Sequence, residues 1–163
     1  MLKDYQEKII ALLIKQEVLM AKLYEKFGER FPAQKDFWQK LAKEERKHAN
    51  WLEQLYDAAQ KSVLLFEEGK VKNYAMDFFI KWVEGIIAKV DAGEVNEQQA
   101  FFLSLDLERS LIEKNIFCHF EGVTDKAKKI LEFLTTETEG HAQLVEEMCK
   151  KARASSRSGT GDL

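Results

Sequence analysis

The sequence predicts an all-α protein in which four long helices form a bundle and an additional helix lies in the long middle crossover. Only one proline, Pro32, occurs among the 163 residues, and glycine is scarce at eight. Apolar residues recur at helical spacing over long stretches, whereas strand-like alternation and the turn dipeptides that bound strands are absent. These observations together favour helices throughout the chain.

The size and charge of the chain narrow the class of protein. At 163 residues and 18.9 kDa it fits one domain, which we place at residues 1–152. The formal net charge of −3 gives no reason to expect a nucleic-acid partner. No apolar run is long enough to span a membrane, and the charged start MLKDYQEK is unlike a signal peptide. We therefore expect a cytoplasmic protein without a membrane partner, with Cys118 and Cys149 as free thiols.

Two long helices joined by a short turn are expected in the first half. The first covers residues 3–27, with Gly28 as its stop signal. The second covers residues 32–59, because Pro32 fits the first turn of a helix. A connection with a polar centre at residues 67–69 follows.

The second half begins with the crossover helix, a fairly apolar segment expected over residues 73–90. The next helix is expected over residues 96–120, because Asn96 is a good N-cap and Gln99 follows three positions later. Thr124 can cap a last helix that runs to residue 152. The polar Ser/Gly stretch at 153–163 is expected to be a disordered tail.

Ionisable residues interrupt the apolar stripe of every long helix. Glu45 and His48 fill the stripe between Leu41 and Leu52. The first helix carries Glu17 in its stripe, and the later pair of helices carries Glu108 and His141. Each half of the chain therefore offers a Glu in its first helix and a His in its second, as in a weak repeat. Each of these residues taken singly is also compatible with an exposed or polar-paired side chain.

Several ionisable groups at mid-height in one bundle favour a metal site. A lone buried carboxylate is prohibitively costly, and a cluster of carboxylates needs a cation to offset its repulsion. Imidazoles with three or more carboxylates suit iron or manganese, and zinc is also possible. Glu45 and His48 are three positions apart, so both point to one helix face, as in the Glu-x-x-His motif of diiron bundles.

Four stretches resemble the ferritin-like superfamily, specifically its rubrerythrin-type diiron domain: LLIKQEVLMAKLYEKFGERFP, FWQKLAKEERKHANWLEQL, FLSLDLERSLIEK and LTTETEGHAQLVEE. With the crossover they cover nearly the whole chain apart from the tail. The resemblance implies that Glu17, Glu45 and His48 ligate one metal ion and that Glu108 and His141 ligate the other. It also implies that the Glu of each paired motif bridges the two ions.

The sequence departs from the family pattern at two positions. Thr138 stands three residues before His141, where the second Glu-x-x-His motif needs its Glu. Glu137, four positions before His141, can share its helix face and is the candidate replacement ligand. Leu111 occupies the position at which peroxide-reducing rubrerythrins carry an extra Glu, and no rubredoxin domain is present to deliver electrons.

Two kinds of function follow from this pattern. The first is an iron-binding, rubrerythrin-like protein that oxidises ferrous iron or reduces peroxide or oxygen, as a diiron oxidoreductase of the peroxidase or ferroxidase type. It would use hydrogen peroxide or oxygen and, if a peroxidase, a separate electron donor. The second is a degenerate relative with one metal or none, acting as a binding or structural module. Because the crossover segment FFIKWVEGII is apolar, we also expect a homodimer.

Overall fold

The computed structural model describes residues 4–60, 64–66, 73–114, 117, 120–122 and 124–158. These residues form five α-helices, one 3-10 turn and two short strands: α1 (Asp4–Arg30), η1 (Pro32–Gln34), α2 (Lys35–Gln60), β1 (Leu64–Phe66), α3 (Asn73–Asp91), α4 (Glu97–Lys114), β2 (Phe120–Gly122) and α5 (Asp125–Ser158). The prediction of an all-helical protein is confirmed apart from the two strands. None of the described helices is both long and apolar enough to cross a membrane.

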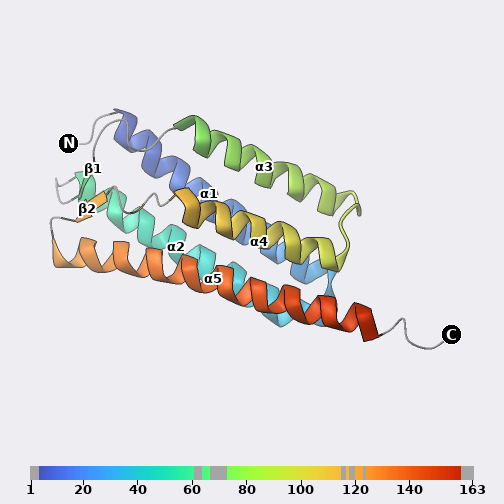
Figure 1. Ribbon diagram of the computed structural model, residues 1–163. Helices are drawn as coiled ribbons and strands as arrows, with labels where there is room; N and C mark the ends of the chain where they lie inside the picture. The colour runs from blue at the N-terminus through green and yellow to red at the C-terminus, as the bar shows by residue number, and fades with distance from the viewer. Residues whose placement is uncertain are drawn as a thin grey trace.

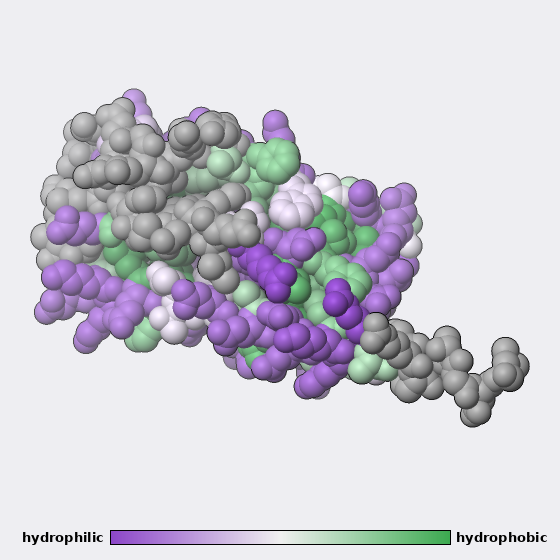
Figure 2. All heavy atoms as spheres, in the orientation of Figure 1, coloured by the Kyte–Doolittle hydropathy of each residue, from purple (hydrophilic) through white to green (hydrophobic). Residues whose placement is uncertain are grey.

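The helices lie side by side as an elongated bundle (Figure 1). α1 packs along α2 and α3, α4 packs along α5, and α2 meets α5. On the face shown in Figure 2, hydrophilic side chains dominate along α5 at the lower edge. Elements from both halves of the chain therefore enclose one interior.

The predicted helix starts of the second half are confirmed. Asn96 Oδ1 accepts a 2.8 Å hydrogen bond from the Gln99 N–H, and Gln99 Oε1 accepts a 2.9 Å bond from the Asn96 N–H. This reciprocal pair satisfies two backbone donors at the start of α4. Thr124 Oγ1 accepts a 3.2 Å bond from the Ala127 N–H and caps α5.

The end of α1 differs from the prediction. Gly28 does not stop the helix, which continues to Arg30. A Cβ at Gly28 would lie 3.4 Å from the Cβ of Trp38, so this glycine is the site of close approach between α1 and α2. Pro32 opens the 3-10 turn, and α2 itself begins at Lys35.

The turn between α3 and α4 has the geometry of a Schellman motif. The Glu94 N–H donates to the Lys89 carbonyl over 2.9 Å, and the Gly93 N–H donates to the Val90 carbonyl over 3.0 Å. Gly93 has a φ of +78°, which a residue without a Cβ adopts at little cost. Arg30 Nη2 donates to the Gly93 carbonyl over 3.1 Å and ties the end of α1 to this turn.

Two further helices end at positions that differ from those predicted from the sequence. α4 ends at Lys114, and Phe120, placed by the sequence in that helix, lies in β2, which pairs antiparallel with β1. α5 continues to Ser158, so residues 153–158 are helical rather than part of a disordered tail. Arg153 and Ala154 are good helix formers, and the Ser155 hydroxyl donates a 3.1 Å hydrogen bond to the Lys151 carbonyl of the preceding turn. Residues 159–163 lie outside the described part of the chain.

The buried apolar side chains form two clusters. One cluster includes Tyr24, Phe27, Trp38 and Phe79, and the other includes Ile10, Leu13, Leu52, Leu55, Leu131 and Leu134. Much of the crossover segment predicted to mediate dimerisation is inside the first cluster, through Phe79, Val83 and Ile86, whereas Phe78 is 70% exposed. The homodimer therefore stays a prediction. Cys149 is a buried free thiol, and Cys118 lies outside the described residues.

Candidate metal centre

A layer of polar side chains lies between the two apolar clusters. On α1 it falls between Leu13 of one cluster and Met20 of the other, and on α2 between Ala42 and Leu52. Five of the six predicted site residues belong to this polar layer and are at most 3% exposed: Glu17, Glu45, His48, Glu108 and His141. The helical stripes of the sequence therefore place these five side chains in the interior, as predicted.

Glu45 is at the centre of the layer. Its Oε1 lies 2.9 Å from Nδ1 of His141, and its Oε2 lies 3.0 Å from Nδ1 of His48. The two imidazole rings are stacked, with centroids 5.1 Å apart and an interplanar angle of 20°. One carboxylate from α2 thus faces both histidines through their equivalent nitrogens.

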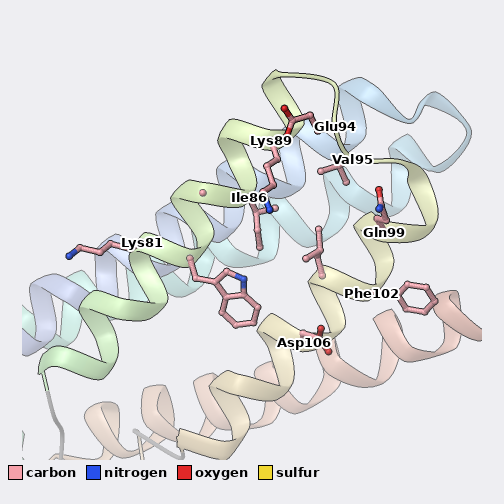
Figure 3. Close-up of a pocket in the computed structure, with 11 residues that line it drawn as sticks. Lys81, Ile86, Lys89, Glu94, Val95, Gln99, Phe102 and Asp106 are labelled. Atoms are coloured by element: carbon pink, nitrogen blue, oxygen red, sulfur yellow. The ribbon is translucent and has the colours of Figure 1, made fainter.

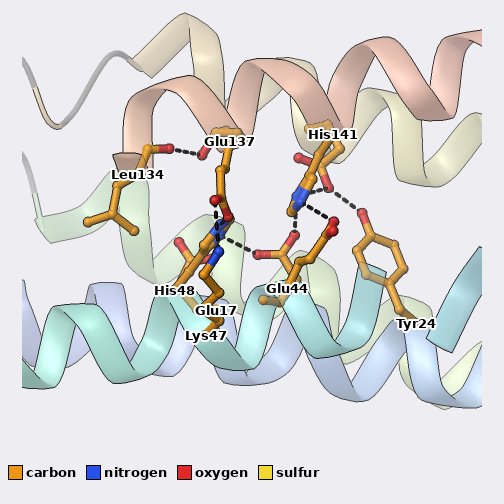
Figure 4. Close-up of polar contacts among 11 residues, drawn as sticks. Glu17, Tyr24, Glu44, Lys47, His48, Leu134, Glu137 and His141 are labelled. Atoms are coloured by element: carbon orange, nitrogen blue, oxygen red, sulfur yellow. Dashed lines mark hydrogen bonds and ion pairs between the residues drawn. The ribbon is translucent and has the colours of Figure 1, made fainter. Parts of the chain in front are cut away.

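One further carboxylate stands beside each histidine. Glu17 Oε2 lies 3.6 Å from Nδ1 of His48, and Glu108 Oε1 lies 3.9 Å from Nδ1 of His141. The Tyr24 hydroxyl donates a hydrogen bond to Glu108 Oε1 (Figure 4). The other oxygen, Glu108 Oε2, is buried and has no hydrogen-bond partner among the residues that the structure describes. A buried carboxylate oxygen without a partner is costly, and a bound cation would remove that cost.

The outer nitrogens of the two histidines bind partly exposed carboxylates from the opposite helix. Glu137 of α5 lies 3.0 Å from Nε2 of His48, and Glu44 of α2 lies 2.9 Å from Nε2 of His141 (Figure 4). Lys47 Nζ donates to the second oxygen of Glu137 over 2.8 Å. The two carboxylates are 29% exposed, and we call them the outer carboxylates.

These contacts place Glu137 differently from the expectation for a replacement ligand. Its carboxylate contacts the nitrogen of His48 that faces away from Glu45, instead of entering the space beside Thr138. Thr138 directs its hydroxyl to the Leu134 carbonyl of its own helix over 2.8 Å. Glu137 therefore lies outside the group around Glu45 in this structure, and its role as a replacement ligand stays a prediction.

Sequence analysis missed Glu44. The available signal was the half-repeat, because Glu44 precedes His48 by four positions just as Glu137 precedes His141. Within a single helix, a spacing of four positions places two side chains side by side, so it suggests that each Glu contacts the His of its own helix. In the folded chain each Glu crosses to the histidine of the other helix, which only the packing of α2 against α5 determines.

The shifted pKa values follow from burial and from this network. Burial, aided by the charge of Glu45, raises the pKa of both Glu17 and Glu108 to about 8. Burial also acts to raise the pKa of Glu45, but the hydrogen bonds from His141 and His48 outweigh it and lower that pKa. For His48 burial opposes the charged form, yet hydrogen bonds to Glu17 and Glu45 raise its pKa to about 11. The pKa of His141 rises to about 9, chiefly through Glu45, against the same effect of burial.

The buried group Glu45, His48 and His141 could hold a metal ion. Each residue offers one ligand atom, and the three atoms lie within 4.8 Å of one another. In the metal-free state, the raised pKa values of His48 and His141 keep both imidazoles protonated. Their Nδ1 protons then lie between the rings and Glu45, where a metal ion could bind. A divalent ion that replaces these protons would meet imidazole and carboxylate donors, the set that iron, manganese and zinc accept.

A separate groove of about 510 Å³ lies between α3 and α4 (Figure 3). Lys81, Lys89, Gln99, Phe102 and Asp106 are among its lining residues. It shares no residue with the polar layer, so the groove is not part of the metal centre.

Comparison with known proteins adds no identification. No family model, curated protein or solved structure matches the chain. The function must therefore be argued from the chemistry of the polar layer itself.

Proposed function

We propose that this chain is a ferritin-like bundle of the rubrerythrin type that binds two divalent iron ions in the polar layer. The observation that carries the proposal is the position of Glu45, whose two oxygens each face a different histidine. A carboxylate so placed can be shared between two ions. α1, α2, α4 and α5 would be the four helices of the bundle, and α3 the additional helix of the crossover.

The donor set fits two ions. Glu17, Glu45 and His48 would hold one ion, and Glu45, Glu108 and His141 the other. Burial, together with the charge of Glu45, raises the pKa of Glu17 and Glu108 to about 8, so ionising all three carboxylates in this layer costs both desolvation and mutual repulsion. Two divalent cations would offset this repulsion and bind the free oxygen of Glu108.

The proposed reaction is the oxidation of ferrous iron by oxygen or hydrogen peroxide, or the reduction of peroxide with electrons from a separate donor. The ferrous pair, when bound, would supply electrons to the oxidant. The chain itself would exclude water through the apolar clusters on both sides of the layer. The Tyr24 hydroxyl would hold Glu108 in place. The outer carboxylates would orient the histidines, each accepting a hydrogen bond from Nε2–H so that Nδ1 points inward.

The residue at position 111 bears on which of the two proposed reactions is the more efficient. Leu111, half-buried against the larger core cluster, provides no extra carboxylate near the ions. Ferrous oxidation is therefore the reaction that we expect to be the more efficient. A homodimer in the cytoplasm remains our proposal for the state of the protein in the cell.

An anaerobic ferrous titration of metal-stripped protein tests this function. We expect two irons per chain by elemental analysis, followed by ferrous oxidation when peroxide or oxygen is added. Glu45→Gln should lose most of the bound iron, because both ions share this carboxylate. Glu53→Gln, an exposed residue of the same helix, is the matched control and should bind like the native chain. No iron in the native chain would contradict the proposal.

One observation favours a second candidate, a site for a single ion. Thr138 supplies no donor to the layer, because its hydroxyl is bonded to the Leu134 carbonyl. The three residues whose ligand atoms lie within 4.8 Å could serve one ion alone. The same titration separates the two candidates: one iron per chain, without reaction with oxygen or peroxide, would favour the degenerate relative as a binding module.

A further inference from the structure

A stack of four rings runs from the polar layer to the surface of the protein. The centroids of His141 and His48 are 5.1 Å apart, those of His48 and Trp51 5.8 Å, and those of Trp51 and Phe133 5.5 Å. The three interplanar angles lie between 20° and 23°, so the rings are nearly parallel. Phe133 at the outer end is 50% exposed, and Trp51 is partly exposed. We call these four residues the ring stack.

Trp51 is the side chain in the ring stack that can take part in electron transfer. An indole ring loses an electron far more readily than a phenyl or imidazole ring does. Trp51 contacts His48 on one side and reaches the partly exposed surface on the other. It therefore joins a proposed metal ligand to the surface through a single oxidisable ring.

A second aromatic path leads away from the polar layer, but its indole ring is buried. Tyr24 binds Glu108 and stacks on Trp38 with a centroid distance of 5.8 Å, and Trp38 stacks on Phe101 at 4.9 Å. All three rings are at most 1% exposed. Beyond Trp38 lies the partly exposed Phe37, at a centroid distance of 4.9 Å, whereas in the ring stack the indole of Trp51 is itself partly exposed.

The charges around Trp51 are compatible with its oxidation. Lys47 Nζ lies 4.4 Å from the centroid of the Trp51 ring, and a cation there disfavours a positive charge on the indole. Glu137 binds the same ammonium group over 2.8 Å and so offsets much of its field. The indole thus faces an ion pair and not an isolated cation.

We propose that Trp51 passes single electrons between the protein surface and the metal centre; this proposal rests on the proposed function. The reduction of one hydrogen peroxide to two waters consumes two protons and two electrons. Both electrons come from an external one-electron donor. In each transfer Trp51 gives one electron to the oxidised centre and regains one from the donor, while its N–H proton stays in place.

The alternative role for Trp51 is to shield His48 from water. Trp51→Phe separates the two roles, because a phenyl ring keeps the stacking and the shielding but is not oxidised under these conditions. Trp51→Tyr restores an oxidisable ring at the same place. Trp82→Phe, on α3 and beside the separate groove, is the matched control.

The decisive measurement is the rate at which a one-electron donor reduces the oxidised protein. Native and variant chains are loaded with ferrous iron, counted for iron per chain, oxidised with one equivalent of hydrogen peroxide and mixed with reduced methyl viologen. We expect Trp51→Phe to slow reduction by about tenfold or more at unchanged iron content, and Trp51→Tyr to recover part of the rate. Trp82→Phe should match the native chain. Electron paramagnetic resonance of samples frozen after a second equivalent of peroxide, for which the ferrous ions no longer supply electrons, should show a tryptophan radical in the native chain that is lost in Trp51→Phe.

Two results would overturn the proposal while leaving the iron site intact. Equal reduction rates in Trp51→Phe and the native chain would mean that electrons do not pass through the indole. Rates equally low in Trp51→Phe and Trp51→Tyr would assign the effect to lost packing. A native chain that binds no iron would overturn the proposed function and this inference together, and the iron count identifies that case.

Discussion

Each buried histidine makes one inward and one outward contact. Nδ1 faces Glu45, and Nε2 binds an outer carboxylate, Glu137 for His48 and Glu44 for His141. A carboxylate that accepts the outer N–H fixes the tautomer and makes the inner nitrogen a better donor to a metal ion. The outer carboxylates therefore matter for affinity although neither lies between the two histidines.

We expect Glu44→Gln and Glu137→Gln each to weaken metal binding by about 10–100-fold, as is typical for such outer partners. The amide keeps the size of the side chain and removes the negative charge that the imidazole N–H prefers. Competition titration with zinc or ferrous iron gives the dissociation constants. Glu139→Gln, an exposed neighbour on α5, is the control and should leave affinity unchanged. Native affinity in both outer-carboxylate variants would contradict the proposed role.

The pKa shifts predict how stability depends on pH in the metal-free protein. The folded chain holds protons on Glu17 and Glu108 up to about pH 8, and on His141 up to about pH 9. A raised folded pKa contributes stability at low pH that is lost as pH rises through the folded value, because the folded state binds more protons. The lowered pKa of Glu45 acts in the opposite sense and costs stability in acid. The free energy of unfolding should therefore fall as pH rises from about 4.5 to about 8 through Glu17 and Glu108, and from about 6.5 to about 9 through His141.

Denaturant unfolding of the metal-free chain at a series of pH values checks this prediction. Glu17→Gln, which cannot ionise, should flatten the decline between about pH 4.5 and pH 8. Metal affinity should change in the opposite direction to stability, since binding releases protons and is favoured as pH rises. A free energy of unfolding that does not fall between about pH 4.5 and pH 8 would show that these carboxylates are already ionised in the folded state.

At the scale of the elements, glycine-to-alanine substitutions within α3 and in the turn after it should change the free energy of unfolding in opposite directions. A Cβ at Gly85, in the middle of the helix, would meet nothing within 4 Å. Gly85→Ala should therefore raise the free energy of unfolding by about 0.5–1 kcal/mol, because alanine loses less backbone entropy in a helix. Gly93 has a φ of +78°, and Gly93→Ala should lower stability by about 1–2 kcal/mol. Urea denaturation at constant pH measures both changes, and a stabilising Gly93→Ala would refute the turn geometry.

At the scale of the whole molecule, the polar layer divides the interior into two apolar clusters. A bound cation that joins side chains of α1, α2, α4 and α5 would tie the two halves of the chain together. Metal that binds only the folded state stabilises it by about 2.7 kcal/mol at a free concentration of 100 times the dissociation constant. We therefore expect the unfolding temperature to rise with ferrous iron or zinc and to fall after chelation. Glu45→Gln should abolish this response, and an equal response in that variant would place the metal elsewhere.

Helical periodicity alone determined the main helices and the five buried ionisable residues. The reason is local: spacings of three and four positions bring Glu17, Glu45, His48, Glu108 and His141 onto the apolar faces of their helices. The start of α4 was also predictable, because the capping pair of Asn96 and Gln99 lies within a single turn. Thr138 stood out only through the resemblance to diiron bundles, whose Glu-x-x-His motif would place a Glu three positions before His141.

Only the tertiary structure decided the contacts between helices. Which nitrogen of His48 and His141 meets which carboxylate depends on the axial offset and rotation of α2 against α5, and no spacing within one helix encodes these quantities. The packing between elements also decides the position of Glu137 outside the group around Glu45 and the pairing of β1 with β2. The ring stack also joins α2 and α5, so Trp51 gains its contact with Phe133 only through packing. The sequence thus determined which residues enter the interior, and the packing of the helices decided what each of them contacts there.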